Sequence, residues 1–295
     1  FTLGDWGSVE RDSEGDNVRD RSYIFTDQDE VKVVSVERWL IIFSPEGIKT
    51  EISRIMSKRD ISAVGVYVYE NSDTDWMFTL GMRDEFNNIT ADNDTLFRVG
   101  SISKMFVALS VMQLVEQKKL NLDSLVRDLV PEVEFSNPWA DTHPVTVAHL
   151  IEHTTGWDDM HMVEWAHNED DPVALNEALQ FHPNSRKSRW APGTRFAYCN
   201  TGPAVAAYIV EKLSGLTFEE YVQTFILDRL TMSSTTFFND ALYQSNDAGA
   251  YAEGKKDSYR NIMYRPSGSM NASINDMKKF LKVFLNPDND NNDLI

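Results

Sequence analysis

Apolar residues recur every three or four positions in four segments of the chain, a spacing that places them on one face of a helix. The segments are 46–56, 101–119, 200–214 and 277–284. A β-branched run at 63–69, followed by polar residues and a further apolar run at 76–80, predicts a β-hairpin instead. Strands near the beginning and helices through the middle, with no internal repeat, predict an α+β or α/β fold.

Residues typical of helix boundaries flank two of these segments. Gly215 follows the third segment and is expected to end it in the left-handed conformation. Thr217 and Glu220 have the spacing of a capping box, in which each side chain accepts a hydrogen bond from the backbone amide of the other residue. Ser273 and Asp276 repeat this spacing before the last segment, so we expect a second reciprocal cap there.

The two ends of the chain differ from the middle in composition. Residues 1–45 are mostly polar and acidic with little periodicity, which predicts a loosely ordered leader outside the core. Residues 46–295 form the predicted globular domain. The run 288–293 is rich in Asp and Asn, but it lacks the glycine and the final glutamate of a calcium loop. We therefore expect a solvated segment there rather than a metal site.

The composition and net charge of the chain limit the classes of molecule that the protein is expected to bind. The chain has 295 residues and a formal net charge of −18, which repels polyanions and argues against nucleic acid and anionic membranes as partners. No apolar run approaches the ~20 residues of a transmembrane helix. The single cysteine, Cys199, excludes an internal disulfide and a cysteine-based zinc site. The first residues lack a signal-peptide pattern, which indicates a cytosolic protein or a mature form.

Ser101 and Lys104 form the sharpest chemical motif. They lie at the predicted start of the 101–119 helix, and residues three apart share one helical face. A serine hydroxyl needs an adjacent base to become a nucleophile, and the helix amino terminus favours a neutral lysine and can accept a developing oxyanion. The alternative is that the spacing occurs by chance and that Ser101 only caps the helix.

A second motif lies almost a hundred residues later. In an extended segment Tyr198 and Asn200 project to the same side, while Cys199 between them turns away. A tyrosine held near a cation can take a proton from Ser101, and an asparagine can hydrogen-bond an amide or carbonyl group of a substrate.

Three motifs together resemble the signatures of serine β-lactamases and penicillin-binding proteins. They are Ser101-Ile102-Ser103-Lys104, Leu150-Ile151-Glu152-His153-Thr154-Thr155-Gly156 and Tyr198-Cys199-Asn200. The resemblance is strongest to the branch that holds class C β-lactamases, D-aminopeptidases and esterases, and it covers residues 46–285. It implies the α+β fold of β-lactamases and transpeptidases, with an antiparallel sheet flanked by helices and a mostly helical region.

The resemblance also implies a role for each residue of these motifs. Ser101 would be the acylated nucleophile, Lys104 its proton partner and Tyr198 the general base, while Asn200 would bind the substrate and His153 would be structural. The implied substrate is a small molecule or peptide with an amide or ester bond: a β-lactam, a D-amino-acid peptide or a carboxylic ester. No cofactor is implied, and the implied location is periplasmic or secreted.

A competing motif points to a zinc peptidase. His149, Glu152 and His153 match the H-x-x-E-H signature, in which two histidines on one helical face bind the metal. A third, acidic ligand would come from Glu164, Glu169 or Asp170. The Thr-Thr-Gly that follows belongs to the serine-hydrolase pattern, and we therefore prefer that family. A G-x-S-x-G elbow is absent, which argues against an α/β-hydrolase.

One element of the family pattern has no counterpart in the sequence. Relatives carry a third motif, a Lys or His followed by a short triplet, on a strand that closes the active site. After Asn200 the nearest candidates are Ser267-Gly268 and Lys255-Lys256, and neither fits. We therefore expect the last strands of the fold to be missing from this chain, which would be a fragment of a longer enzyme or one half of a nicked or swapped assembly in which a companion polypeptide supplies those strands. A non-catalytic, penicillin-binding-like module is the alternative.

Overall fold

The computed structural model describes residues 23–27, 30–34, 44–69, 75–161, 164, 172–249, 251–252, 255–256 and 258–285. The chain divides into two compact units, residues 1–61 and residues 62–295. The predicted segment at 288–293 and the predicted ligands Glu169 and Asp170 lie outside the described residues.

The first unit contains the helix α2 (Pro45–Arg59), which confirms the first of the predicted amphipathic segments. Ser44 caps it by accepting a hydrogen bond from the Gly47 amide at 3.1 Å, and the helix ends at Asp60 in the left-handed conformation. Ahead of it, β1 (Tyr23–Asp27) and β2 (Glu30–Val34) pair as antiparallel strands. The amphipathic pattern predicted the helix, whereas the strands β1 and β2 were not predicted from the sequence.

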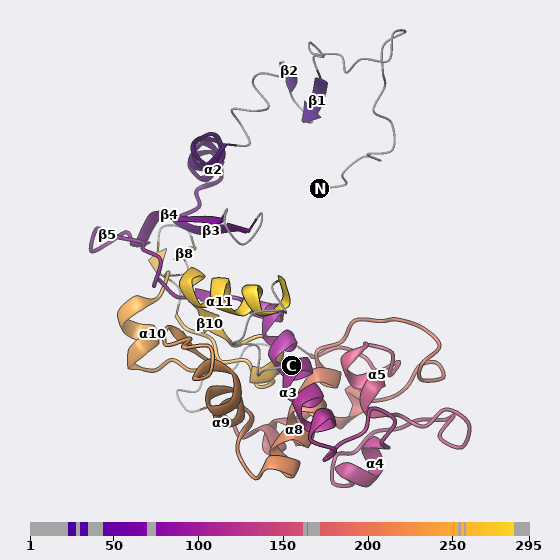
Figure 1. Cartoon of the computed structure of the whole chain (residues 1–295). Helices are drawn as coiled ribbons and strands as arrows, with labels where there is room; N and C mark the ends of the chain where they lie inside the picture. Colours follow the sequence, from indigo (N-terminus) through magenta and orange to yellow (C-terminus); the bar gives the residue numbers. More distant parts are fainter. Residues whose placement is uncertain are drawn as a thin grey trace. The chain divides into compact units, whose positions relative to one another are not determined.

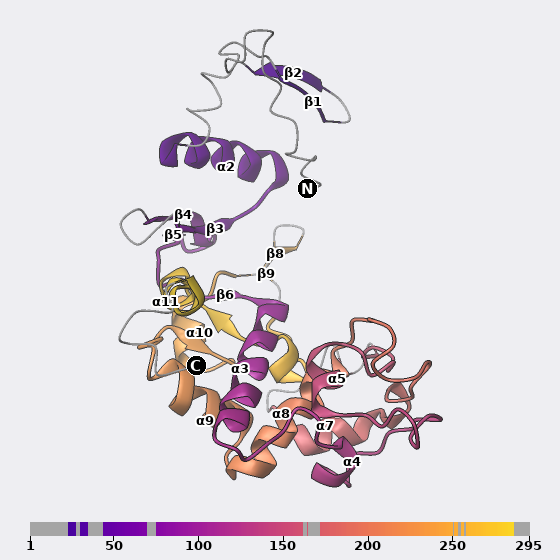
Figure 2. The same ribbon diagram turned by 45° about the vertical axis from the view of Figure 1, so that its right-hand side comes forward.

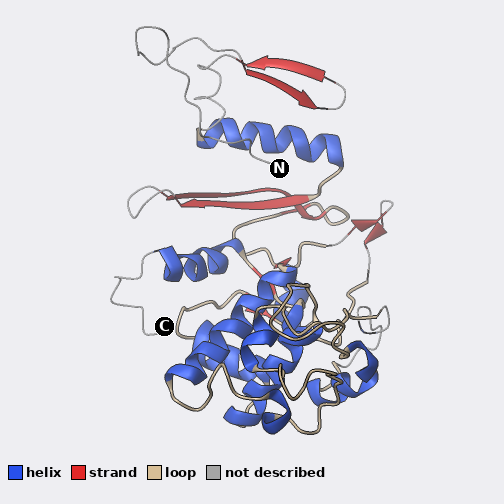
Figure 3. Ribbon diagram, turned by 90° about the vertical axis from the view of Figure 1, so that its right-hand side faces the viewer, coloured by secondary structure: helices blue, strands red, loops and turns tan. Residues whose placement is uncertain are grey.

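The second unit begins with the predicted hairpin. Strands β3 (Ala63–Tyr69) and β4 (Asp75–Asp84) pair in antiparallel register, and β5 (Ile89–Thr90) adds to the other edge of β4. In the three-stranded sheet so formed, β3 is an end strand. The helix α11 (Ile274–Leu285) packs on β3, where a Cβ atom on Gly65 would lie 3.3 Å from that of Ile274. Figure 3 shows this hairpin together with the mainly helical remainder of the unit.

Helices form most of the core of this unit. The unit includes the helices α3 (Ser103–Glu116), α4 (Val126–Leu129), α5 (Val147–Ile151), α7 (Leu175–Phe181), α8 (Thr201–Ser214), α9 (Phe218–Val222) and α10 (Ala241–Asn246). Helix α8 is buried along its first ten residues because α3, α5 and α9 pack around it. Figures 1 and 2 show α3 beside α8. Stacking of Phe106 on Phe280, with ring centroids 4.1 Å apart, joins α3 to α11.

Two smaller sheets complete the unit. Strand β10 (Asn271–Ala272) lies between β6 (Phe97–Arg98) and β7 (Thr235–Thr236), and both of its pairings are antiparallel. Strands β8 (Tyr251–Ala252) and β9 (Lys255–Lys256) form a short separate pair. The architecture is α+β, as the sequence predicted. Strand β6 is the element that leads directly into the Ser101 segment.

The helix caps agree with the sequence at one predicted site and differ at the other. Gly215 ends α8 with φ 76°, and the reciprocal box between Thr217 and Glu220 is formed. Before α11, Ser273 accepts from the Asp276 amide at 3.2 Å. The predicted return bond is wrong, because the buried Asp276 carboxylate accepts instead from the Ser234 amide and the Thr235 hydroxyl. This aspartate therefore ties α11 to β7.

Candidate active site

Ser101, Lys104 and Tyr198 converge at one point. Ser101 lies in a single 3-10 turn, Gly100–Ile102, between β6 and α3. The Lys104 ammonium donates to Ser101 Oγ at 3.1 Å. The Tyr198 hydroxyl, which is 97 residues away in the chain, donates to the same oxygen at 2.7 Å. One hydroxyl thus receives two hydrogen bonds from groups that can exchange protons with it.

The turn at Ser101 is fixed by its backbone. Gly100 adopts φ 57°, a left-handed conformation that glycine takes readily. The Ser103 hydroxyl donates to the Gly100 carbonyl at 2.6 Å and accepts from the Met270 amide at 3.3 Å, which fastens the start of α3 to the end of the 265–270 segment. Ser103, and not Ser101, therefore has the structural role at this helix terminus, and Ser101 is left exposed.

Lys104 is held in place by three groups. Besides its contact with Ser101, its ammonium donates to the Ser267 carbonyl at 2.5 Å and lies 5.0 Å from the centroid of the Tyr198 ring. A carbonyl and an aromatic face both attract a positive charge. Among the described residues no carboxylate forms an ion pair with Lys104, so its charge acts mainly on Ser101 and Tyr198.

The segment that contains His153 supports the loop that carries Tyr198. The His153 carbonyl accepts from the Ala197 amide at 2.9 Å, and the Thr154 carbonyl accepts from the Gly193 amide at 2.9 Å. His153 Nδ1 accepts from the Cys199 amide at 3.3 Å, and its ring lies 4.4 Å from that of Tyr198. Burial, and then the nearby Lys104 charge, lower the pKa of His153. A neutral imidazole with an accepting Nδ1 fits the structural role predicted for this residue.

Asn200 is the fourth predicted site residue, and it is buried. Its side-chain amide donates to both oxygens of Asp159, at 2.9 and 3.2 Å, and its backbone amide donates to the same carboxylate at 2.8 Å. Its carbonyl accepts from the Ser267 hydroxyl at 2.7 Å, and the Ser267 carbonyl in turn holds Lys104. The predicted contact of Asn200 with substrate stays a prediction, since its amide hydrogens are bound to Asp159.

Asp159 and Ser267 are the residues of the site that sequence reasoning did not assign. Asp159 follows the 150–156 motif closely, so an acidic side chain beside that motif was the available signal. Ser267 contributes its main-chain carbonyl, which every residue has, and no sequence pattern could identify it. Cys199 is fully buried and Tyr198 is 44% exposed, but Asn200 is buried as well, so the predicted shared side of Tyr198 and Asn200 stays a prediction.

A cavity of about 200 Å³ opens at Ser101. Its lining residues are Arg98, Gly100, Ser101, Arg260, Ile262, Ser267 and Gly268. Of the two segments considered for a third motif, Ser267-Gly268 thus borders the nucleophile. Lys256, from the other segment, lines a different cavity and pairs with Asp247 at 3.1 Å.

The geometry contradicts the zinc-peptidase alternative. Helix α5 ends at Ile151, and His153 lies beyond it with φ 58°, so the two histidines do not share a helical face. His149 Nδ1 accepts from the Thr146 amide at 3.2 Å as part of a cap. Glu164 is buried and accepts from the Tyr264 hydroxyl at 2.6 Å. Across the described residues, no three His, Cys, Asp or Glu side chains are grouped as metal ligands.

Comparison with known proteins agrees with this geometry. The protein family described as Beta-lactamase matches residues 48–294. A beta-lactamase of Yersinia enterocolitica is 24% identical over 242 residues, which are 82% of this chain and 59% of that protein. Penicillin-binding protein 4 of Amycolatopsis lactamdurans is 27% identical over 140 residues, 48% of this chain and 35% of that protein. The chain therefore spans about a third to three-fifths of these relatives' length.

Solved structures show the same fold. The octameric penicillin-binding protein homologue from Pyrococcus abyssi aligns with a TM-score of 0.70 and 26% identity, over 83% of this chain and 57% of that one. A class C beta-lactamase aligns with a TM-score of 0.68 and 22% identity, over 84% and 65% of the two chains. None of the described helices is long and apolar enough to cross a membrane. The chain belongs to the beta-lactamase family, and its fold is that of β-lactamases and transpeptidases.

Proposed function

We propose that the protein is a serine hydrolase that forms an acyl-enzyme through Ser101 on an amide or ester substrate. The observation that carries this proposal is the pair of hydrogen bonds to Ser101 Oγ, from Lys104 at 3.1 Å and from Tyr198 at 2.7 Å. A nucleophile within hydrogen-bond reach of a base, with that base oriented by further groups, is the arrangement that covalent catalysis requires. The family consists of serine hydrolases and their relatives, which supports the assignment to this class.

The proposed reaction begins with attack by Ser101 Oγ on the substrate carbonyl. In the proposed reacting form Tyr198 is a phenolate, stabilised by the Lys104 charge 5.0 Å from the ring centroid, and it takes the Oγ proton to become the phenol. The carbonyl oxygen becomes negative, and a backbone amide directed at this oxygen would stabilise the developing charge. Tyr198 then protonates the leaving group, and the acyl-enzyme forms. Hydrolysis repeats these steps with water as the nucleophile.

Asn200 completes the proposed site as a substrate-binding residue. Asp159 engages its amide nitrogen, which leaves the side-chain oxygen as the atom that can accept a hydrogen bond from substrate. Such an acceptor would favour substrates that carry an amide N–H near the reacting carbonyl. β-Lactams and D-amino-acid peptides have this group, whereas a simple carboxylic ester does not.

Labelling tests the nucleophile directly. A fluorescent penicillin and a fluorophosphonate should each modify the protein at Ser101, and Ser101→Ala should abolish the label. Ser110→Ala is the matched control, since this serine lies on α3 and its hydroxyl bonds the Phe106 carbonyl. Labelling that persists in Ser101→Ala would refute the assignment. Rates on nitrocefin, a D-Ala-D-Ala peptide and a p-nitrophenyl ester would then rank the three substrate classes.

Two further parts of the proposal concern the whole protein. We propose that the protein acts in the periplasm or outside the cell, as the family resemblance suggests. We also propose that a companion segment pairs with β3, the end strand of its sheet among the described residues. Intact-mass measurement of the native protein should find a longer polypeptide or a second one. A single species ending at Ile295 would contradict the companion.

One alternative function follows from the short alignment with relatives. A module that binds penicillin-like ligands without turning them over would need the fold but not a complete active site. Full-length protein that shows no acylation by either probe would favour this alternative. The presence of Ser101, Lys104 and Tyr198 in one hydrogen-bonded group argues for catalysis instead.

A further inference from the structure

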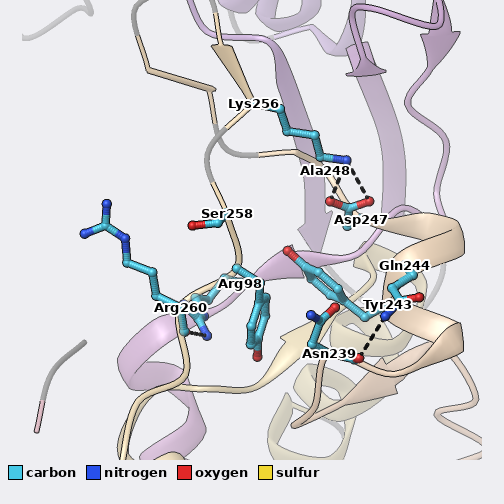
Figure 4. A pocket seen from close by; sticks show the side chains of 10 residues that line it. Arg98, Asn239, Tyr243, Gln244, Asp247, Ala248, Lys256, Ser258 and Arg260 are labelled. Carbon is cyan, nitrogen blue, oxygen red and sulfur yellow. Dashed lines mark hydrogen bonds and ion pairs between the residues drawn. The ribbon is translucent and has the colours of Figure 1, made fainter. Parts of the chain in front are cut away.

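A second cavity adjoins the one that opens at Ser101. Its volume is about 450 Å³, within the usual range of about 300–1,000 Å³ for small-molecule sites. Both cavities are lined by Arg98 and Arg260, so they meet at these two arginines. The remaining lining residues are Asn239, Tyr243, Gln244, Asp247, Ala248, Lys256, Ser258 and Tyr259. We call this space the arginine pocket (Figure 4).

Arg98 is the most informative residue of the arginine pocket. It is on β6, and one of its guanidinium nitrogens donates to the Arg260 carbonyl at 2.8 Å. The guanidinium also lies 4.6 Å from the centroid of the Tyr259 ring. Within the part of the chain that the structure describes, no carboxylate forms an ion pair with Arg98. Most of its five donors are therefore available to a bound group, while the carbonyl and the ring fix its orientation.

Two other arginines of this unit are paired with carboxylates. Arg265 bonds Glu219 at 2.7 Å in a buried pair, and Arg189 lies 3.4 Å from Asp158. Arg98 bonds a neutral carbonyl, as Arg83 and Arg186 do, but of these three arginines only Arg98 lines the two cavities. A guanidinium oriented in a cavity without a counterion is the feature expected of a site for an anion.

The charge of the arginine pocket is opposite to that of the whole chain. The chain carries −18 overall. The pocket, by contrast, has three cationic side chains and one carboxylate, Asp247, which is already paired with Lys256 at 3.1 Å. In Figure 4 this pair lies apart from Arg98 and Arg260. Distant surface charges are screened beyond about 8–10 Å at physiological salt, so the nearby guanidinium groups determine what binds here.

The arginine pocket lies within reach of Ser101. Arg98 precedes Ser101 by three positions, and three residues span at most about 11 Å even when fully extended. A group bound by Arg98 can thus belong to the same small molecule whose carbonyl reacts at Ser101. A planar guanidinium matches the two oxygens of a carboxylate, which favours a carboxylate over a more weakly matched anion.

We propose that the arginine pocket binds a carboxylate on the acyl part of the substrate, so that Arg98 selects acyl groups with a terminal acid. This inference rests on the proposed function for the acyl chemistry at Ser101, and it adds the class of acyl group. The polar amides of Asn239 and Gln244 line the same space and favour a hydrated, anionic end over an apolar chain.

Two esters that differ only at the far end of the acyl chain test this proposal. In the full-length protein, kcat/KM for mono-p-nitrophenyl glutarate should exceed that for p-nitrophenyl pentanoate at least tenfold, and the ratio should fall as salt is added. Arg98→Gln should abolish the ratio through KM for the glutarate ester, and Arg98→Lys should restore part of it. Arg127→Gln, which removes an exposed arginine on α4, should leave the ratio unchanged. Equal rates on both esters in the unmodified protein would overturn the proposal.

Binding to the Ser101→Ala variant separates this inference from the proposed function. Titration with monomethyl glutarate, followed by calorimetry or NMR, should detect binding that Arg98→Gln weakens at least tenfold. If neither ester is hydrolysed but monomethyl glutarate binds, the acyl-enzyme proposal is wrong, whereas carboxylate binding in the arginine pocket is supported. No binding at millimolar concentration would overturn the pocket itself. If Arg98→Gln unfolds, Arg260→Gln gives the same comparison, because Arg260 lines both cavities.

Discussion

Removal of the Tyr198 hydroxyl is the sharpest perturbation of the proposed chemistry. Tyr198→Phe deletes the atom that donates to Ser101 Oγ at 2.7 Å. It keeps the ring, and with it the packing on His153 at 4.4 Å and the contact with Lys104 at 5.0 Å. The substitution therefore changes the proton path and leaves the neighbouring side chains supported.

The expected magnitude follows from the role of a general base. Such a group contributes about 10²–10⁴ in rate, which corresponds to about 3–5 kcal/mol in the activation free energy. The free energy of unfolding should change much less. Tyr198 is 44% exposed, and a single hydrogen bond contributes about 1 kcal/mol net even when it is better shielded.

Both quantities can be measured on the same samples. The change in activation free energy comes from the acylation rate with a fluorophosphonate and from kcat/KM for the best substrate. Urea unfolding gives the free energy of unfolding. We expect a loss of at least a hundredfold in acylation and a stability within about 1 kcal/mol of the unmodified protein. Acylation within threefold of the unmodified protein would refute the role of Tyr198 as base. A large loss of stability would show that the hydroxyl is structural.

Two further variants test a buried carboxylate on α8 and the carboxylate that holds Asn200. Burial raises the pKa of Glu211 to about 7, so its folded form binds a proton that the unfolded form releases above its ordinary pKa. The folded protein is therefore destabilised as the pH rises from about 4.5 to about 7. In urea unfolding, Glu211→Gln should raise the free energy of unfolding by about 2 kcal/mol at pH 8 and leave it unchanged at pH 4.5. Asp159→Ala should raise KM for amide substrates about tenfold because Asn200 loses its anchor. Asp158→Ala, which removes a carboxylate that pairs with Arg189 rather than with Asn200, is the control, and an equal effect of both would contradict the anchoring role.

The sequence predicted the elements whose cause is local. An apolar repeat is enough to specify α2, α3, α8 and α11, because a helix buries the face on which its apolar residues recur. The pairing of Ser101 with Lys104 is local in the same sense, since a helical turn brings residues three apart together. The capping box between Thr217 and Glu220 was predicted for the same reason, because its two residues are only three positions apart.

Prediction failed where a side chain found a better partner far along the chain. Asp276 has the spacing of a cap, yet its carboxylate bonds Ser234 and Thr235 about forty residues away. A buried carboxylate needs several donors, and Ser234 and Thr235 supply two of them to one oxygen while Lys279 on α11 bonds the other. The zinc motif failed in a similar way, because α5 ends before His153 and only the fold decides where a short helix stops.

The sequence by itself determined the family, the helices and the nucleophile with its lysine, because these depend on residue spacing over a few positions. Only the tertiary structure decided that Tyr198 reaches Ser101, that Asp159 holds Asn200, and that a carbonyl of Ser267 fixes Lys104. The arginine pocket beside Ser101 belongs to this second group. Contacts between segments far apart in the chain arise when the core packs, and packing depends on all the residues together rather than on any one motif.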